Sequence, residues 1–115
     1  MSRRIRGGDR LLTIHLDESV WALAVTGVSL DGASLPEAVR ATLERAPRNA
    51  FVPRIREVTC TAGEAEQLAE FLSSVASVLA SRNGQDAASQ CLRAQRSVRY
   101  ALRRSWRSPQ ERGLQ

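Results

Sequence analysis

The stretch TAGEAEQLAEFLSSVASVL, residues 61–79, carries the clearest helix signal in the chain. Thr61 and Glu64 have the spacing of a capping box, in which each side chain accepts a hydrogen bond from the backbone N–H of the other residue. Apolar residues then recur at three- and four-residue intervals and form one stripe: Ala65, Leu68, Leu72, Val75 and Leu79. Phe71 and Val78 widen this stripe, so we expect two neighbouring elements to cover it.

A second helix is predicted to follow after a short turn. Asn83-Gly84 is a stop signal, because both residue types tolerate the left-handed backbone that ends a helix. The next helix, over residues 87–107, would then pack antiparallel to the first. We expect it to end before Pro109, which leaves residues 108–115 as a frayed tail.

The beginning of the chain is predicted to form a β-hairpin. In residues 11–16 (LLTIHL) the apolar Leu12, Ile14 and Leu16 fall on one face, which is typical of a half-buried strand. Residues 20–28 contain four β-branched residues and an internal glycine. This composition favours a strand over a helix, where glycine alone costs about 1 kcal/mol relative to alanine. We therefore expect residues 20–28 to pair with residues 11–16.

Two further elements complete the predicted sheet and its cover. Residues 35–45 have the apolar spacing of a helix, and residues 54–60 (RIREVTC) are expected to form a third strand. The predicted order is β-β-α-β-α-α. This is an α+β fold in which a small β-sheet with one packed helix precedes a C-terminal antiparallel helical hairpin.

The chain length fits one domain. With 115 residues it can bury a core without metals or disulfides. We expect a flexible basic arm at residues 1–10 and a single domain at residues 11–107. The domain would divide into a β-β-α-β part, residues 11–60, and the helical hairpin, residues 61–107.

The basic side chains are all arginines. The chain has 17 arginines, no lysine and a net charge of +5. Such a charge favours anionic partners, namely nucleic acid, an acidic protein face or a phospholipid surface. An arginine-only complement is also what a GC-rich genome produces without selection for function, so the placement of the arginines matters more than their number.

Six arginines and a tyrosine share one arc of the predicted helix 87–107. We call this set the arginine ridge: Arg93, Arg96, Arg99, Tyr100, Arg103, Arg104 and Arg107. Wound at 3.6 residues per turn, the ridge lies opposite the apolar side of the helix. The ridge could neutralise several phosphates, and Tyr100 could stack on a base.

The nucleic-acid interpretation of the arginine ridge has one alternative, and the chain has one further candidate contact. The ridge could be a solvated helix face, with part of its charge balanced by Glu64, Glu66 and Glu70 of the preceding helix. The basic arm is a second candidate nucleic-acid contact, through Arg3, Arg4 and Arg6.

Catalytic and metal-binding patterns are missing from the sequence. His15 is the only histidine, and there is no nucleophile elbow, phosphate-cradling glycine loop or zinc-ligand spacing. Cys60 and Cys91 are expected to be buried thiols, and a pair of Cys60 with His15 would lack a third, orienting group. We therefore predict that the chain is not an enzyme and binds no metal or cofactor.

No targeting or membrane segment is predicted. The start of the chain lacks the pattern of a signal peptide, and the longest uncharged run, residues 19–30, is too short to span a bilayer. A cytoplasmic protein without a membrane partner is the expectation.

Part of the chain, residues 11–46, resembles the HicB-type antitoxin domain. The residues that carry this resemblance are VWALAV at 20–25, Gly27, DGASL at 31–35 and EAV at 37–39. In that family a β-hairpin runs into a helix that starts with the pattern G-x-S-x-x-E-A. The resemblance implies a partner-binding domain that neutralises a small RNase.

The same stretch is also similar to ribbon-helix-helix repressors. Its ribbon would be residues 12–18, its interhelix turn residues 32–34 and its second helix residues 37–43. This resemblance implies a dimer that points Leu11, Thr13 and His15 into the DNA major groove. It also requires a helix, in place of a strand, at residues 18–30.

Together these features predict a small non-enzymatic regulator of antitoxin or transcriptional-repressor type. It would associate with DNA through the arginine ridge and form a homodimer, because the apolar face of residues 62–80 is broad. The alternative is a protein–protein interaction or assembly module with no nucleic-acid role. The ridge would then face an acidic protein or only water.

Overall fold

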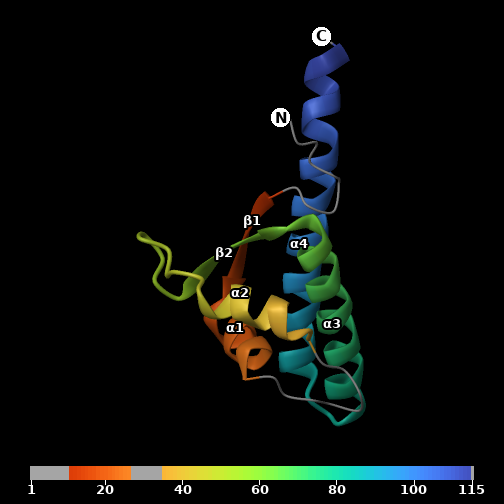
Figure 1. Cartoon of the computed structure of the whole chain (residues 1–115). Helices are drawn as coiled ribbons and strands as arrows, with labels where there is room; N and C mark the ends of the chain where they lie inside the picture. The colour runs from red at the N-terminus through yellow and green to blue at the C-terminus, as the bar shows by residue number, and fades with distance from the viewer. Residues whose placement is uncertain (1–10, 27–34, 115) are drawn as a thin grey trace.

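The computed structural model describes residues 11–26 and 35–114, with the backbone alone for residues 105–114 (Figure 1). Its elements are β1 (Leu11–Asp17), α1 (Glu18–Val25), α2 (Glu37–Glu44), β2 (Ile55–Thr61), α3 (Ala62–Ser81) and α4 (Gln85–Leu114). In these residues the fold is α+β, as predicted, with two strands and four helices. The observed order is β-α-α-β-α-α, which differs from the predicted order at the second element.

The second element is a helix, so the strand predicted at residues 20–28 is wrong as far as Val25, where α1 ends. The side chain of Asp17 caps this helix, because its Oδ1 accepts hydrogen bonds from the backbone N–H and the hydroxyl of Ser19, at 3.0 and 2.8 Å. Val20 and Ala24, four residues apart, are both buried. Burial of one helical face outweighs the β propensity of these residues.

The sheet pairs β1 with β2 instead. The two strands are antiparallel, and their register runs from Leu11 opposite Thr61 to Asp17 opposite Ile55. A strand does lie where one was predicted at residues 54–60, as β2, but it is the second strand of a two-stranded sheet and not the predicted third. The alternation predicted for β1 also holds, since Ile14 and Leu16 are buried while Thr13 and His15 are exposed.

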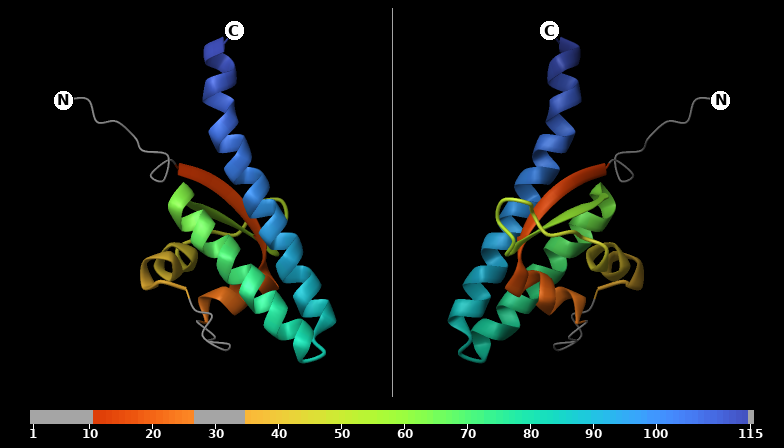
Figure 2. Two further views of the ribbon diagram at one scale, coloured as in Figure 1. Left: turned by 90° about the vertical axis from the view of Figure 1, so that its right-hand side faces the viewer. Right: turned by 90° about the vertical axis from the view of Figure 1, so that its left-hand side faces the viewer.

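The predicted helical hairpin is confirmed. The backbone N–H of Glu64 donates to Thr61 Oγ1 and that of Thr61 donates to Glu64 Oε1, which is the predicted capping box. Asn83 takes a left-handed backbone with φ of 65°, and Gly84 N–H donates to the carbonyl of Leu79 at 2.7 Å. Figure 2 shows α3 and α4 side by side with the sheet packed against them.

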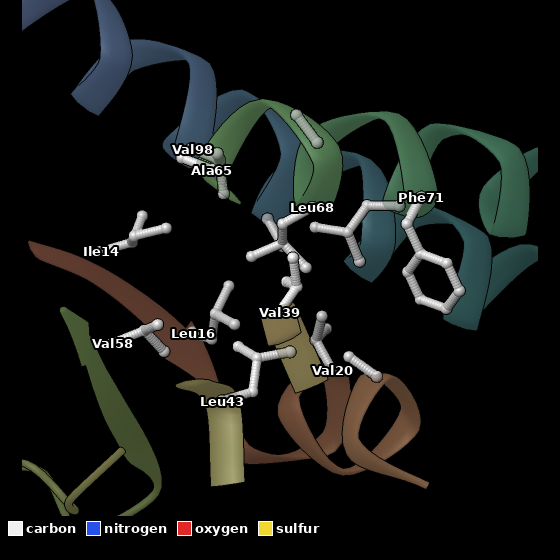
Figure 3. Packing of buried hydrophobic residues seen from close by; sticks show 14 of the residues in the cluster. Ile14, Leu16, Val20, Val39, Leu43, Val58, Ala65, Leu68, Phe71 and Val98 are labelled. Carbon is white, nitrogen blue, oxygen red and sulfur yellow. The ribbon is translucent and has the colours of Figure 1, made fainter. Parts of the chain in front are cut away.

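The core lies between the helical hairpin and the layer formed by the sheet, α1 and α2 (Figure 3). Leu68 and Val98 face Ile14, Leu16 and Leu43 across this layer boundary. Phe71, which widens the stripe of α3, is buried within the chain, whereas Val78 is only half-buried. The fold thus covers most of the apolar face that suggested a homodimer, and dimerisation stays a prediction with little of that surface to support it.

The C-terminal helix is longer than predicted. It continues through Pro109 to Leu114, and its last turns extend beyond the rest of the fold (Figure 1). The residues that follow the proline, Gln110, Glu111 and Arg112, have high helix propensity, which favours continuation over the predicted fraying. The predicted basic arm, residues 1–10, lies outside the described residues.

Candidate functional site

An open groove runs between β1 and α4. It consists of two hollows of about 270 and about 480 Å³, both lined by His15 and Ser97. The other polar residues along it are Thr13, Asp17, Arg54, Gln90, Arg93, Arg96, Tyr100 and Arg104. We call this feature the β1–α4 groove, and four of its lining residues are arginines.

The groove follows from the periodicity of its two walls. In β1 the exposed Thr13 and His15 alternate with the buried Ile14, so the outer face of the strand is polar at these two positions. In α4, four groove residues recur at helical spacing along one flank: Arg93, Ser97, Tyr100 and Arg104. Because β1 packs beside α4, these two polar faces meet along a common channel.

The structure divides the arginine ridge into two groups. Arg93, Arg96, Tyr100 and Arg104 line the groove. Arg99 and Arg103 are also exposed but line neither hollow. The remaining predicted residues, Arg107 and the arm residues Arg3, Arg4 and Arg6, have side chains outside the described part of the chain.

Arg54 is a groove residue that sequence reasoning missed. Its backbone carbonyl accepts a hydrogen bond from the N–H of Glu18 at 2.7 Å, and its Nε lies 3.6 Å from Asp17 Oδ2. Only the pairing of β1 with β2 brings Arg54 to this place. A prediction that Ile55 lies opposite Asp17 would have found it, but the expected hairpin gave β1 a different partner.

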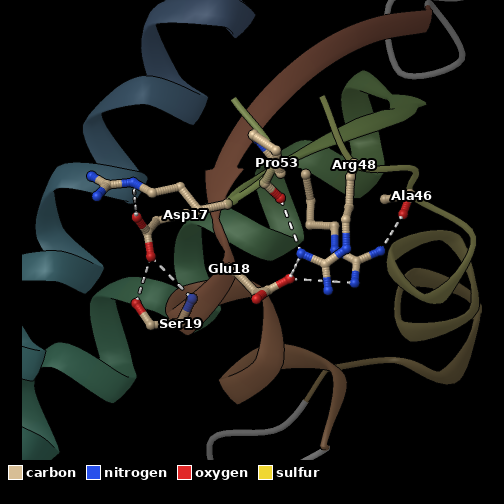
Figure 4. A network of polar contacts seen from close by, with 8 residues as sticks. Asp17, Glu18, Ser19, Ala46, Arg48 and Pro53 are labelled. Atoms are coloured by element: carbon tan, nitrogen blue, oxygen red, sulfur yellow. Dashed lines mark hydrogen bonds and ion pairs between the residues drawn. The ribbon is translucent and has the colours of Figure 1, made fainter. Parts of the chain in front are cut away.

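A network around Glu18 holds the loop that carries Arg54 (Figure 4). The Glu18 carboxylate binds both Arg48 and Arg56. Arg48 Nη1 also donates to the carbonyl of Pro53, and Arg56 Nη1 donates to that of Ala46, each at 3.0 Å. Both guanidinium groups are therefore engaged in contacts within the fold.

Unlike Arg48 and Arg56, the groove arginines of α4 form no ion pair with a described residue. Within the described residues the ion pairs involve His15, Arg48, Arg54 and Arg56, and none involves Arg93, Arg96 or Arg104. The compensation expected from α3 is not seen there either. The carboxylate of Glu64 binds Thr42 and the backbone of Thr61, while Glu66 and Glu70 are exposed and form no ion pair with a described residue.

Two carboxylates border the basic residues of the groove and are already engaged. Hydrogen bonds from Ser19, with a smaller contribution from the charge of Arg54, hold the pKa of Asp17 below its ordinary value. Glu57 Oε2 lies 3.5 Å from His15 Nε2 and also accepts a hydrogen bond from Asn49. Asp17 thus offsets the charge of Arg54, whereas Arg93, Arg96 and Arg104 have no carboxylate partner among the described residues.

One aromatic ring lies among these charges. The side chain of Tyr100 is 61% exposed, and the guanidinium carbon of Arg104 lies 5.7 Å from its ring centroid. That distance is at the outer end of the range for a cation–π contact. The ring therefore keeps most of its surface available for stacking on a ligand.

Reactive thiol chemistry has no support in the described residues. Burial, with a smaller effect of Glu64, raises the pKa of Cys60 to about 12, and burial also raises the pKa of Cys91. Cys60 lies on the inner face of the sheet and His15 on the outer face, so they do not form a pair. No group of three His, Cys, Asp or Glu side chains that could hold a metal ion occurs among these residues.

None of the helices, as far as the structure describes them, is both long and apolar enough to cross a membrane. Comparisons of the chain with protein-family models, with curated proteins and with solved structures found no match. The two resemblances noted in the sequence therefore stay predictions. Helix α1 is the kind of element that the ribbon-helix-helix resemblance requires at this position, whereas β1 has its antiparallel partner in β2 of the same chain.

Proposed function

We propose that this protein is a small non-enzymatic regulator, of antitoxin or transcriptional-repressor type, that associates with DNA through the arginine-lined helix α4. The observation that carries this proposal is the absence of an ion pair, within the described residues, at Arg93, Arg96 and Arg104. Exposed arginines that no carboxylate neutralises are available to phosphates, and each contact releases a condensed counterion from the nucleic acid.

The spacing of these arginines supports a polyanion as the ligand. Arg93 and Arg104 are about 16 Å apart along the helix axis, at 1.5 Å per residue. An acidic protein could pair with some of these charges, but a nucleic acid presents phosphates at regular intervals over the whole length. The exposed ring of Tyr100 between them adds a stacking surface, which an acidic peptide does not require.

The test is binding of a fluorescent DNA duplex of roughly 20 base pairs over a series of salt concentrations. For four to five phosphate contacts, the slope of log affinity against log salt should be about −4. Replacing Arg96 by Ala should make this slope less negative by about one unit. Arg45→Ala removes the same charge from an exposed site at the end of α2 and should leave the slope unchanged.

No binding at low salt would contradict the proposal. An equal loss with Arg45→Ala and Arg96→Ala would show that only net charge matters, and would remove α4 as the interface.

A second candidate function, a protein-interaction module, is favoured by one separate observation. Phe51 is 92% exposed at the tip of the loop between α2 and β2, beside Val52 at 46%. The backbone N–H groups of both residues donate to Asn49 Oδ1 at 2.8 Å, so the loop presents them in a fixed turn. A stoichiometric protein partner that Phe51→Ser releases, while DNA affinity is unchanged, would support this candidate.

A further inference from the structure

We propose that the β1–α4 groove binds a single strand of nucleic acid, with Tyr100 stacking on an unpaired base. This inference rests on the proposed association with DNA and names the form of nucleic acid that the groove accepts. In this proposal the groove residues of the arginine ridge contact the single strand, whereas Arg99 and Arg103 do not.

The packing of β1 against α4 argues against insertion of this part of α4 into a duplex. An α-helix with its side chains is about 10–12 Å across, and the major groove of DNA is about 12 Å wide, so a helix alone fills it. Here β1 lies along the flank of α4 that carries Arg93 and Arg104. Those side chains cannot reach the bases of a duplex together with their helix, because the strand would enter the major groove with them.

The two hollows have different linings, which match the two parts of a nucleotide. The smaller one is lined by Arg93, which has no ion pair with a described residue, and by Arg54, whose charge Asp17 partly offsets, so we assign one phosphate to Arg93. The larger, of about 480 Å³, has Tyr100 on one wall and the hydroxyls of Thr13 and Ser97 nearby. Its volume is within the range of about 300–1,000 Å³ typical of small-ligand sites, which is enough for a base and its sugar.

Tyr100 is the residue that separates single-strand from duplex binding. Its ring is available for stacking because it is largely exposed within the groove. Base faces are open to a side chain only where the bases are not stacked in a duplex. A basic channel combined with an exposed aromatic ring is the arrangement by which proteins hold single strands without sequence preference.

The experiment compares two labelled probes on the full chain: a mixed-sequence oligonucleotide of roughly 20 nucleotides, and the duplex it forms with its complement. We expect Tyr100→Ala to weaken single-strand binding about tenfold and to leave duplex binding unchanged, because stacking on one base is lost. Tyr100→Phe should bind like the original protein, since stacking needs the ring and not the hydroxyl.

A pair of arginine variants provides the matched control. Arg93→Ala and Arg99→Ala remove the same charge from the same exposed helix, but only Arg93 lines the groove. Arg93→Ala should weaken single-strand binding several-fold more than Arg99→Ala. Equal losses in the two variants would overturn the groove as the site.

The outcomes separate this inference from the proposed function. If neither probe binds at low salt, both fail. If the duplex binds and the single strand does not compete with it, DNA association stands and the groove assignment is overturned. Because Arg93, Arg99 and Tyr100 are exposed, all these variants should keep the circular dichroism spectrum and unfolding midpoint of the original protein.

Discussion

Replacing Trp21 by Phe tests whether residues 18–25 form α1, where the sequence indicated a strand. The indole Nε1–H of Trp21 donates to the carbonyl of Leu43 at 2.7 Å, which ties α1 to the end of α2. The guanidinium of Arg56 lies over the same ring, 3.9 Å from its centroid, and the Arg56 side chain is only 16% exposed. One side chain thus links α1, α2 and β2.

The expected cost is the sum of two losses. The hydrogen bond contributes about 1 kcal/mol, and the carbonyl of Leu43 keeps a second donor in the N–H of Ala46 at 3.0 Å. Exchanging indole for phenyl also weakens a largely desolvated cation–π contact, by about 1 kcal/mol. Trp21→Phe should therefore lower the free energy of unfolding by about 2 kcal/mol, or the melting temperature by roughly 8 °C.

Urea unfolding followed by circular dichroism measures this change. The exposed Phe51 supplies the control, since Phe51→Leu should alter stability by less than about 0.5 kcal/mol. A double-mutant cycle of Trp21→Phe with Arg56→Met should give a coupling energy of about 0.5–1 kcal/mol. A Trp21→Phe protein as stable as the original, with no coupling to Arg56, would refute the packing of α1 described above.

Three further expectations follow from local contacts. Thr61→Ala removes the capping box of α3 and should cost about 1 kcal/mol in urea unfolding, with no change in its m-value. The pKa of Asp17 is lowered, mainly by hydrogen bonds from Ser19, so its stabilisation is present above the unfolded pKa of 3.8 and is lost as pH falls through the lower folded value. Asp17→Asn should accordingly flatten the loss of stability in acid, measured as the urea midpoint below about pH 4. Burial raises the pKa of Cys60 and Cys91, so a thiol reagent at about pH 8 should label neither in the native protein and both in urea.

The elements that were predicted correctly have signals confined to a few neighbouring residues. The capping box of Thr61 and Glu64 fixes the start of α3, and Asn83-Gly84 fixes its end, because both act through backbone groups within one turn. The alternation of β1 likewise depends only on which face of a strand is buried. Such features are readable from sequence since no distant residue is needed to produce them.

Helix α1 shows what local sequence signals alone do not predict. Its β-branched residues favour a strand, and Asp17 with Glu18 was interpreted as the turn of a hairpin. In the structure the same two residues are the N-cap and the acidic first turn of a helix. The signal was therefore present, but the choice between a turn and a cap depends on burial of Val20 and Ala24 by elements far away in the chain.

The groove was beyond prediction for a related reason. Helical periodicity placed Arg93, Arg96 and Arg104 on one arc, which the structure confirms as exposed. It could not show that β1, some eighty residues earlier, lies along one flank of that arc and separates these side chains from Arg99 and Arg103. The groove exists only because β1 lies beside this face of α4.

The arginines of the chain fall into two groups, according to whether they form contacts within the fold. Genome composition can explain why every basic residue is arginine, but it does not explain what each one contacts. Arg56 contacts Ala46 through Nη1 and Glu18 through Nη2, whereas a lysine has a single nitrogen from which to reach both. Arg93 and Arg104 have no carboxylate partner among the described residues, so no ion pair there fixes their side chains. The fold thus uses some arginines as structural contacts and leaves others exposed at the groove, and the proposed ligand would bind this second group.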